Sequence, residues 1–92
     1  MLYTRVEQMK SPASGNPVPN QYIIIDDVGE TFQSYRSLIA RKEYEGKIYL
    51  DESFWNYSRT TAKYRNEFLM ENTEETRKKI KSGEYILTDL NC

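Results

Sequence analysis

Between residues 21 and 50 the chain carries four short strand-forming stretches, joined by connections too short to hold a helix. The stretches are 21–26, 31–35, 37–41 and 47–50. Residues 23–25 are three consecutive isoleucines, and Ile48 and Leu50 alternate with more polar residues, which is typical of strands. A parallel pair would need a crossover of a dozen or more residues. The sequence therefore predicts an antiparallel meander of three to four strands.

The segments on either side of the first stretch are expected to be turns or loops. Asp27-Val28-Gly29 has turn chemistry, and Gly29 can adopt a positive φ without steric cost. Residues 1–10 fit either a short strand or an adapting arm. Residues 11–20 contain three prolines and a glycine, which favours a loop or a semi-extended lead-in. We therefore divide the chain into an arm and Pro-rich lead-in (1–20) and a single α+β domain (21–92).

Two short helices and a final strand are predicted after the meander. Ser58 can cap a helix over 59–69, and Thr73 can cap a second helix that ends before Gly83, where a left-handed cap is expected. Residues 85–88 are expected to return as a strand. In the first helix the spacing of three and four residues predicts a buried face of Thr61, Tyr64, Phe68 and Leu69. The expected fold class is α+β.

The length and the low apolar content predict self-association. A chain of 92 residues buries only roughly 60% of the surface of its unfolded form. Its hydrophobic fraction is 38%, below the usual range of about 45–50% for a globular chain. A second copy could cover the remaining apolar surface and the exposed sheet edges. We therefore expect a homo-oligomer.

The residues that most enzymes and metal sites need are scarce. The chain has no histidine, and its one cysteine is Cys92. This composition excludes a Ser-His-Asp arrangement and any zinc site that combines Cys and His. The acidic pairs at 26–27 and 51–52 are interpreted as solvated turn residues. We expect no catalysis, no cofactor and no metal.

Charge and hydropathy argue against two classes of partner. The chain has 13 basic and 14 acidic residues, whereas duplex-DNA binders normally carry a cationic excess. The longest aliphatic run is residues 23–25, far below the length that spans a bilayer, and residues 1–5 lack the apolar core of a signal peptide. A lone cysteine fits a reducing compartment. We expect a cytoplasmic protein without a membrane partner.

The stretch from 54 to 65, FWNYSRTTAKYR, is the densest candidate for ligand binding. Aromatic rings can stack on bases, guanidinium groups can pair with phosphates, and a helix that begins near Ser58 would add a positive dipole end. The alternative is structural, with Trp55 and Tyr64 in the core and Arg59 and Lys63 on a solvated face. The candidate residues are Tyr57, Ser58, Arg59, Thr60, Thr61, Lys63, Tyr64 and Arg65.

Residues 32–37 form a second candidate segment. Gln33 and Tyr35 would be exposed in one register and buried in the other, so they are included among the candidate ligand-binding residues. The structural alternative is an ordinary strand that places Phe32 in the core.

Several stretches between residues 16 and 91 resemble a known family. They include 20–24 (NQYII), 32–35 (FQSY), 37–40 (SLIA) and, most specifically, 57–69 (YSRTTAKYRNEFL). They are similar to DUF8033, a family of small, functionally unassigned proteins found widely in bacteriophages. Asn56, Arg41 and Met70 depart from the family pattern, which usually has an acid, an apolar residue and a glycine at these positions.

The resemblance implies a phage protein made in the cytoplasm of an infected bacterium. Small non-enzymatic phage proteins are often counter-defence factors, and anti-CBASS sponge proteins sequester cyclic dinucleotides. We therefore expect a cyclic nucleotide ligand. The expected roles are base stacking by Tyr35, Tyr57 and Tyr64, phosphate neutralisation by Arg59, Lys63 and Arg65, and specificity from Ser58, Thr60 and Thr61.

Other functions stay open at this point. One is a protein–protein inhibitor that docks on a host defence or replication enzyme. Another is a weak binder of single-stranded nucleic acid, although the near-neutral charge counts against it. A structural component of the virion is a further alternative.

Overall fold

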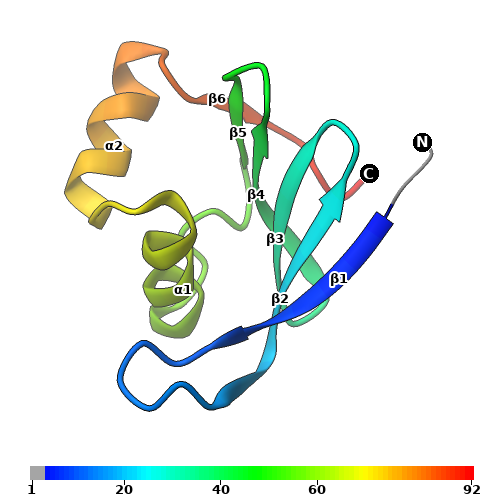
Figure 1. Ribbon diagram of the computed structural model, residues 1–92. Coiled ribbons are helices and arrows are strands. Elements are labelled where there is room, and N and C mark those ends of the chain that lie inside the picture. The colour runs from blue at the N-terminus through cyan, green and yellow to red at the C-terminus, as the bar shows by residue number, and fades with distance from the viewer. Residues whose placement is uncertain (1–3) are drawn as a thin grey trace.

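The computed structural model describes residues 4–92 and shows one sheet with two helices against one side of it (Figure 1). In chain order the elements are β1 (Thr4–Lys10), β2 (Pro17–Asp26), β3 (Gly29–Ser34), β4 (Ser37–Glu43), β5 (Ile48–Asp51), α1 (Arg59–Leu69), α2 (Thr73–Ser82) and β6 (Ile86–Thr88).

The six strands lie in the sheet in their order along the chain. Each neighbouring pair from β1 to β5 is antiparallel, and β6 is parallel to β5. Helices α1 and α2 form the crossover that a parallel pair requires. The α+β class, the two helices and the final strand are confirmed. The expected meander of three to four strands is wrong, because five strands form it and β6 completes a six-stranded sheet.

The additional strand comes from the first twenty residues. Residues 4–10, which the sequence left open between a strand and an arm, form β1. Strand β2 begins at Pro17, inside the segment expected to be a loop or lead-in. Pro19 lies where the β1–β2 register shifts, between the pairs Gln8–Tyr22 and Lys10–Pro17. Prolines are tolerated at a strand start and at such irregularities, because no regular ladder bond needs their missing N–H.

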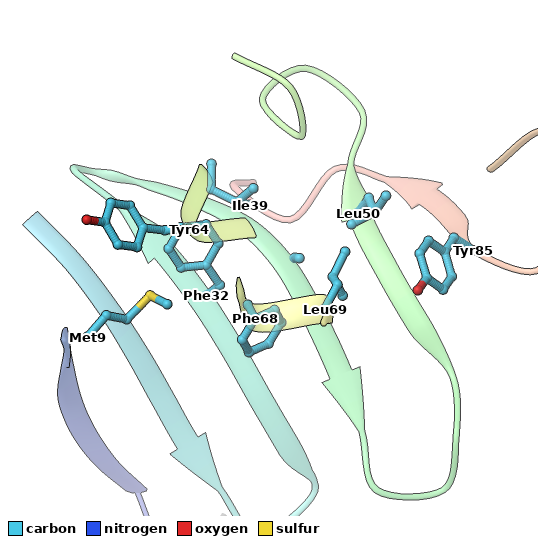
Figure 2. Close-up of a cluster of buried hydrophobic side chains, with 9 residues drawn as sticks. Met9, Phe32, Ile39, Leu50, Tyr64, Phe68, Leu69 and Tyr85 are labelled. Carbon is cyan, nitrogen blue, oxygen red and sulfur yellow. The ribbon is translucent and has the colours of Figure 1, made fainter. Parts of the chain in front are cut away.

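The hydrophobic core lies between the sheet and α1, with α2 contributing at one end. Phe32, Ala40 and Leu50 are fully buried on adjacent strands, and the Phe32 and Phe68 ring centroids are 5.9 Å apart. A register shift between β3 and β4 lets Ile39 and Ala40 both be buried although they are consecutive. Figure 2 shows the cluster, in which the helical contribution is Tyr64, Phe68 and Leu69.

The β2–β3 turn differs in detail from the prediction. Gly29 does not have a positive φ. A Cβ at this position would lie 2.3 Å from the main-chain oxygen of Lys42, so glycine is needed for close strand packing. The carboxylate of Asp26 shapes the turn by accepting hydrogen bonds from the amides of Val28 (2.8 Å) and Gly29 (2.9 Å).

The helix boundaries follow local capping signals. The Ser58 side chain accepts a hydrogen bond from the Thr61 amide, as predicted for the cap of α1. The cap of α2 is Asn72, one residue before the predicted Thr73, and it forms a capping box with Glu75. Gly83 ends α2 in the left-handed region with φ 85°, as expected.

A buried carboxylate joins α2 to the start of β6. Glu71 accepts hydrogen bonds from Thr76 Oγ1 (2.6 Å), Lys79 Nζ (2.8 Å) and the Tyr85 hydroxyl (2.6 Å). Burial of the Tyr85 hydroxyl, together with its hydrogen bond to Glu71, raises the pKa of Tyr85 to about 12. These contacts fix the end of the crossover and therefore the position of β6.

Within residues 4–92, no helix is both long enough and apolar enough to cross a membrane.

Candidate functional site

A pocket of about 700 Å³ lies between the β3–β4 turn and the start of α1. This volume is within the range of roughly 300–1,000 Å³ that is usual for small-molecule sites. Residues from three separate parts of the chain meet there: the middle of β2, the β3–β4 turn and the segment from 54 to 61. The lining residues are Asn20, Ser34, Tyr35, Arg36, Ser37, Ile39, Phe54, Tyr57, Ser58, Thr60 and Thr61.

The β3–β4 turn brings Tyr35 to the pocket in an unusual backbone conformation. Ser34 and Ser37 are paired, so Tyr35 and Arg36 form a two-residue connection, and Tyr35 has φ 57°. A bulky residue in the left-handed region is uncommon and strained. The side chain of Gln33 donates to the Tyr35 main-chain oxygen at 2.8 Å and supports the turn. Tyr35 stays 50% exposed, so its ring is available to a ligand.

Three hydroxyl groups tie the start of α1 to the end of β3. Ser58 Oγ donates to Thr61 Oγ1 at 3.1 Å, and Thr61 Oγ1 lies 3.0 Å from Ser34 Oγ. Thr61 and Ser34 are almost fully buried. Their hydrogen bond fixes the N-terminus of α1 against the sheet, and both side chains also line the pocket.

The segment that leads into α1 carries the second exposed tyrosine. Asp51 Oδ2 accepts hydrogen bonds from the amides of Ser53 (3.0 Å) and Phe54 (2.9 Å), which fixes the turn after β5. The rings of Phe54 and Tyr57 meet edge to face with centroids 5.5 Å apart. Tyr57 is 68% exposed, so most of its ring is open to solvent. The pocket therefore has exposed tyrosines on two separate segments.

The charge around the pocket favours an anionic group. Arg36 lines it and is exposed. The first turn of α1 contains no acidic residue, whereas the first turn of α2 has Glu74 and Glu75. The positive end of the α1 dipole is thus left without a local carboxylate. Ser58 and Thr60 at that end both line the pocket.

Two of the predicted ligand-binding residues are buried away from the pocket lining. Tyr64 is 6% exposed and belongs to the hydrophobic core. Arg65 is fully buried, and its guanidinium nitrogens donate to the main-chain oxygen of Trp55 (2.7 Å), Asn56 Oδ1 (2.9 Å), Asn66 Oδ1 (2.9 Å) and Thr73 Oγ1 (2.7 Å). Burial, together with the nearby Arg77, lowers the pKa of Arg65.

Arg65 acts on the pocket through the loop that it holds. Its bonds to Trp55 and Asn56 fix the chain just before Tyr57 and Ser58. The guanidinium also lies 5.1 Å from the Trp55 ring centroid, a cation–π contact. In this structure Arg65 is a positioning residue for the loop that carries Tyr57.

The other predicted residues divide into two groups. Tyr35, Tyr57, Ser58, Thr60 and Thr61 all line the pocket. Gln33, Arg59 and Lys63 do not. Arg59 and Lys63 are exposed on α1, where Lys63 Nζ lies 5.4 Å from the Tyr64 ring centroid, and Gln33 supports the β3–β4 turn.

The sequence did not identify six of the lining residues. They are Asn20, Ser34, Arg36, Ser37, Ile39 and Phe54. A signal existed for four of them, because Ser34, Arg36 and Ser37 lie in the candidate segment 32–37 and Phe54 lies in the candidate stretch 54–65. The strands predicted at 31–35 and 37–41 left Arg36 between them, and the tight turn there brings Tyr35 and Arg36 to the same pocket. Asn20 had no comparable signal, since its contribution depends on β2 pairing with β3.

No group of three or more His, Cys, Asp or Glu side chains in the described part of the chain is arranged to hold a metal ion. The chemistry of the pocket comes from hydroxyl groups, two tyrosines, one arginine and the amides at the start of α1.

Comparison with known proteins adds one finding. The model of a family of unknown function, DUF8033, matches residues 4–84. The match begins within β1, which the resemblance in sequence had not included, and it contains every pocket residue. Searches of curated proteins and of solved structures gave no match. Because the family model covers most of the chain, the protein belongs to the DUF8033 family of unknown function.

Proposed function

We propose that this protein binds a cyclic nucleotide in the pocket between the β3–β4 turn and α1, and that it sequesters the ligand without converting it. In the proposed setting, a phage makes the protein in the host cytoplasm to withdraw a cyclic (di)nucleotide signal of bacterial immunity. The proposal rests on the chemistry of the pocket, combined with the phage setting that the sequence resemblance implies.

The observation that carries the proposal is the pair of exposed tyrosines, Tyr35 and Tyr57, on separate segments that line one pocket. A base offers a flat π-face to each ring, and base–aromatic stacking contributes roughly 1–3 kcal/mol per base. Two rings on separate segments suit a ligand with two bases. The strained φ of Tyr35 supports a functional role, because such strain concentrates at binding sites.

The phosphates would meet the basic side of the pocket. Arg36 offers a guanidinium that can pair with a phosphate in a bidentate manner. The amides and the dipole at the start of α1 favour an anion as well. Thr60 is exposed and its hydroxyl can donate to phosphate or sugar oxygens, whereas the Ser58 hydroxyl already donates to Thr61 Oγ1. Arg59 and Lys63 lie nearby on α1 and add positive charge outside the pocket lining.

Native mass spectrometry with a panel of cyclic mono- and dinucleotides tests the proposal. We expect uptake of one class of cyclic nucleotide at integer stoichiometry, and recovery of the same unmodified ligand after the protein is denatured. A changed ligand mass would replace sequestration with catalysis.

Matched variants then test the site by titration calorimetry. Tyr57→Ala and Arg36→Ala should each weaken binding by roughly ten- to a hundredfold, which is the loss expected for one stacked base or one charged hydrogen bond. Tyr44→Ala is the control, because Tyr44 is 61% exposed and does not line the pocket. Circular dichroism checks that each variant is folded. Unchanged affinity in both pocket variants would overturn the site.

The panel also separates the alternatives. No uptake of any cyclic nucleotide would favour the protein–protein inhibitor, whose target can be identified by capture from host lysate. Binding of single-stranded oligonucleotides that weakens steeply with salt would favour the nucleic-acid alternative.

A further inference from the structure

Strand β1 forms an open edge of the sheet. It lies at one end of the strand order, and no other strand within residues 4–92 pairs with its outer side. Six of its seven residues are exposed, and Val6 is 59% exposed. An open edge of this length is a template for pairing with another chain.

The other edge is a poorer template. Strand β6 has three residues, against seven in β1. Beyond it, the segment that follows is held to the sheet, since the Leu90 amide donates to Asp51 Oδ1 at 2.8 Å. Short edges are a usual protection against pairing. Strand β1 is therefore the edge that is suited to a partner.

The regular part of β1 is centred on Val6. Its pairing with β2 is continuous from Thr4 to Gln8, and the register shifts between Gln8 and Lys10. In an antiparallel pair of two identical strands, a two-fold axis through Val6 would align these regular parts completely. Residue Val6 would then face its own copy, and Arg5 would face Glu7 of the other strand.

This register makes β1 complementary to itself. Alternate residues point to opposite faces of a sheet, so Arg5 and Glu7 share one face and Val6 lies on the other. Arg5 Nη2 and Glu7 Oε2 are 3.0 Å apart within the strand, and both side chains are about half exposed. A second strand in this register would place an opposite charge across from each of them. The four charges would alternate in sign on one face.

The opposite face would gain an apolar contact. Val6 is paired with Ile24, which is only partly buried on the side of the sheet away from the helices. A second Val6 across the edge would extend this apolar row from one sheet into the next. Part of the exposed area of Val6 would thereby be covered.

We propose that β1 pairs with β1 of a second copy of this chain, antiparallel and with Val6 at the two-fold axis, to form one continuous sheet. The partner is fixed by charge: in this register each Arg5 meets a Glu7, and each Val6 meets a Val6. None of the three residues lines the pocket, so the interface and the nucleotide site are tested independently.

The first measurement is the solution mass by light scattering or sedimentation. The wild type should have about twice the chain mass of 10.9 kDa. Val6→Lys should reduce the mass to that of one chain, since it places two ammonium groups together at the axis. The matched control is Ile86→Lys on the opposite edge, where the residue is 41% exposed, and it should leave the dimer intact.

Charge reversal with mixing gives the sharper test. Arg5→Glu alone should produce a monomer, because every charged pair across the axis becomes acidic. Glu7→Arg alone should also produce a monomer, because every pair becomes basic. An equal mixture of the two variants should form a heterodimer, since each acidic strand then meets a basic one.

The mixture distinguishes pairing between two strands from the Arg5–Glu7 ion pair within one strand. Neither variant has this internal pair, so a heterodimer must be stabilised by contacts between the strands. Heterodimer formation in the mixture, with two monomeric parents, supports the proposal. A monomeric wild type at the highest attainable concentration would overturn it. So would a mixture that stays monomeric, or a dimer that Ile86→Lys breaks and Val6→Lys does not.

Discussion

The guanidinium of Arg65 donates to the side-chain oxygen of Asn56 at 2.9 Å, and all four of the acceptors around this buried cation are neutral oxygens. Buried charges are usually paired, because desolvation is costly. Four hydrogen bonds to neutral oxygens compensate for the burial of this charge, with Glu71 as a nearby carboxylate. Two of the four acceptors lie in the loop that carries Tyr57, so this loop is tied to the charge of one helical residue.

A carboxylate at position 56 should therefore stabilise the protein. Asn56→Asp keeps the shape of the side chain and turns a neutral acceptor into a charged one, which should raise the free energy of unfolding by about 1 kcal/mol at pH 7. Asn56→Ala removes the acceptor and should lower it by a similar amount. Urea denaturation measures both. An Asp variant no more stable than the wild type would show that the neutral acceptors already satisfy Arg65.

The end of α1 offers a second stabilising change. Met70 has φ 59° at the C-cap and is 88% exposed, so its side chain contributes little packing. Glycine adopts this backbone conformation without the cost of about 1 kcal/mol that a Cβ imposes. Met70→Gly should raise the free energy of unfolding by about that amount. Met70→Ala, which keeps the Cβ, should stay within roughly 0.5 kcal/mol of the wild type.

The strain at Tyr35 should be separable from its role in binding. Both Tyr35→Gly and Tyr35→Ala remove the ring, and both should weaken nucleotide binding on the proposed function. Only glycine relieves the positive φ, so the Gly variant should be more stable than the Ala variant by about 1 kcal/mol. Equal stability of the two variants in urea denaturation would mean that the turn relaxes when the ring is lost.

The Asp26–Arg41 ion pair should make stability depend on acid pH. The hydrogen bond from Arg41, together with the bond from the Val28 amide, lowers the pKa of Asp26 from 3.8 to about 2. The folded state therefore binds fewer protons than the unfolded state between these values, and stability should fall as the pH drops from about 4 to about 2. Above that window the contribution is fully present.

Denaturation curves at several pH values between 2 and 5 check this prediction. Asp26→Asn cannot ionise and should show a smaller loss across the window. It should also be less stable than the wild type at pH 7 by about 3 kcal/mol, since Arg41 would lose the nearer of its two carboxylate partners. The same slope in both proteins would assign the acid sensitivity to other carboxylates.

The sequence predicted the structural features that depend on residues close together in the chain. The bounds of α1 and its Ser58 cap follow from residues within four positions of each other, and so does the left-handed cap at Gly83. Strand β1 has no such signal, because an edge strand with both faces largely exposed shows no apolar alternation. Its pairing depends on β2, which the sequence did not extend back to Pro17.

The part of the candidate site that was predicted is the part whose residues lie close together in the sequence. Tyr57, Ser58, Thr60 and Thr61 adjoin one helix start, so their grouping is visible in the sequence. Arg65 was assigned to the ligand because of its charge. Its spacing, four residues after Thr61 and three before Phe68, places it on the buried face of the same helix. Helical spacing was the better guide to its position.

The parallel pairing of β5 with β6 implies an order of assembly. Strands β1 to β5 can pair one after another as the chain is synthesised, because each pairing joins strands that are neighbours along the chain and are linked by short connections. Strand β6 can reach the free edge of β5 only after the chain has returned through α1 and α2. On a ribosome, the last strand would therefore close the sheet after the pocket residues are already together.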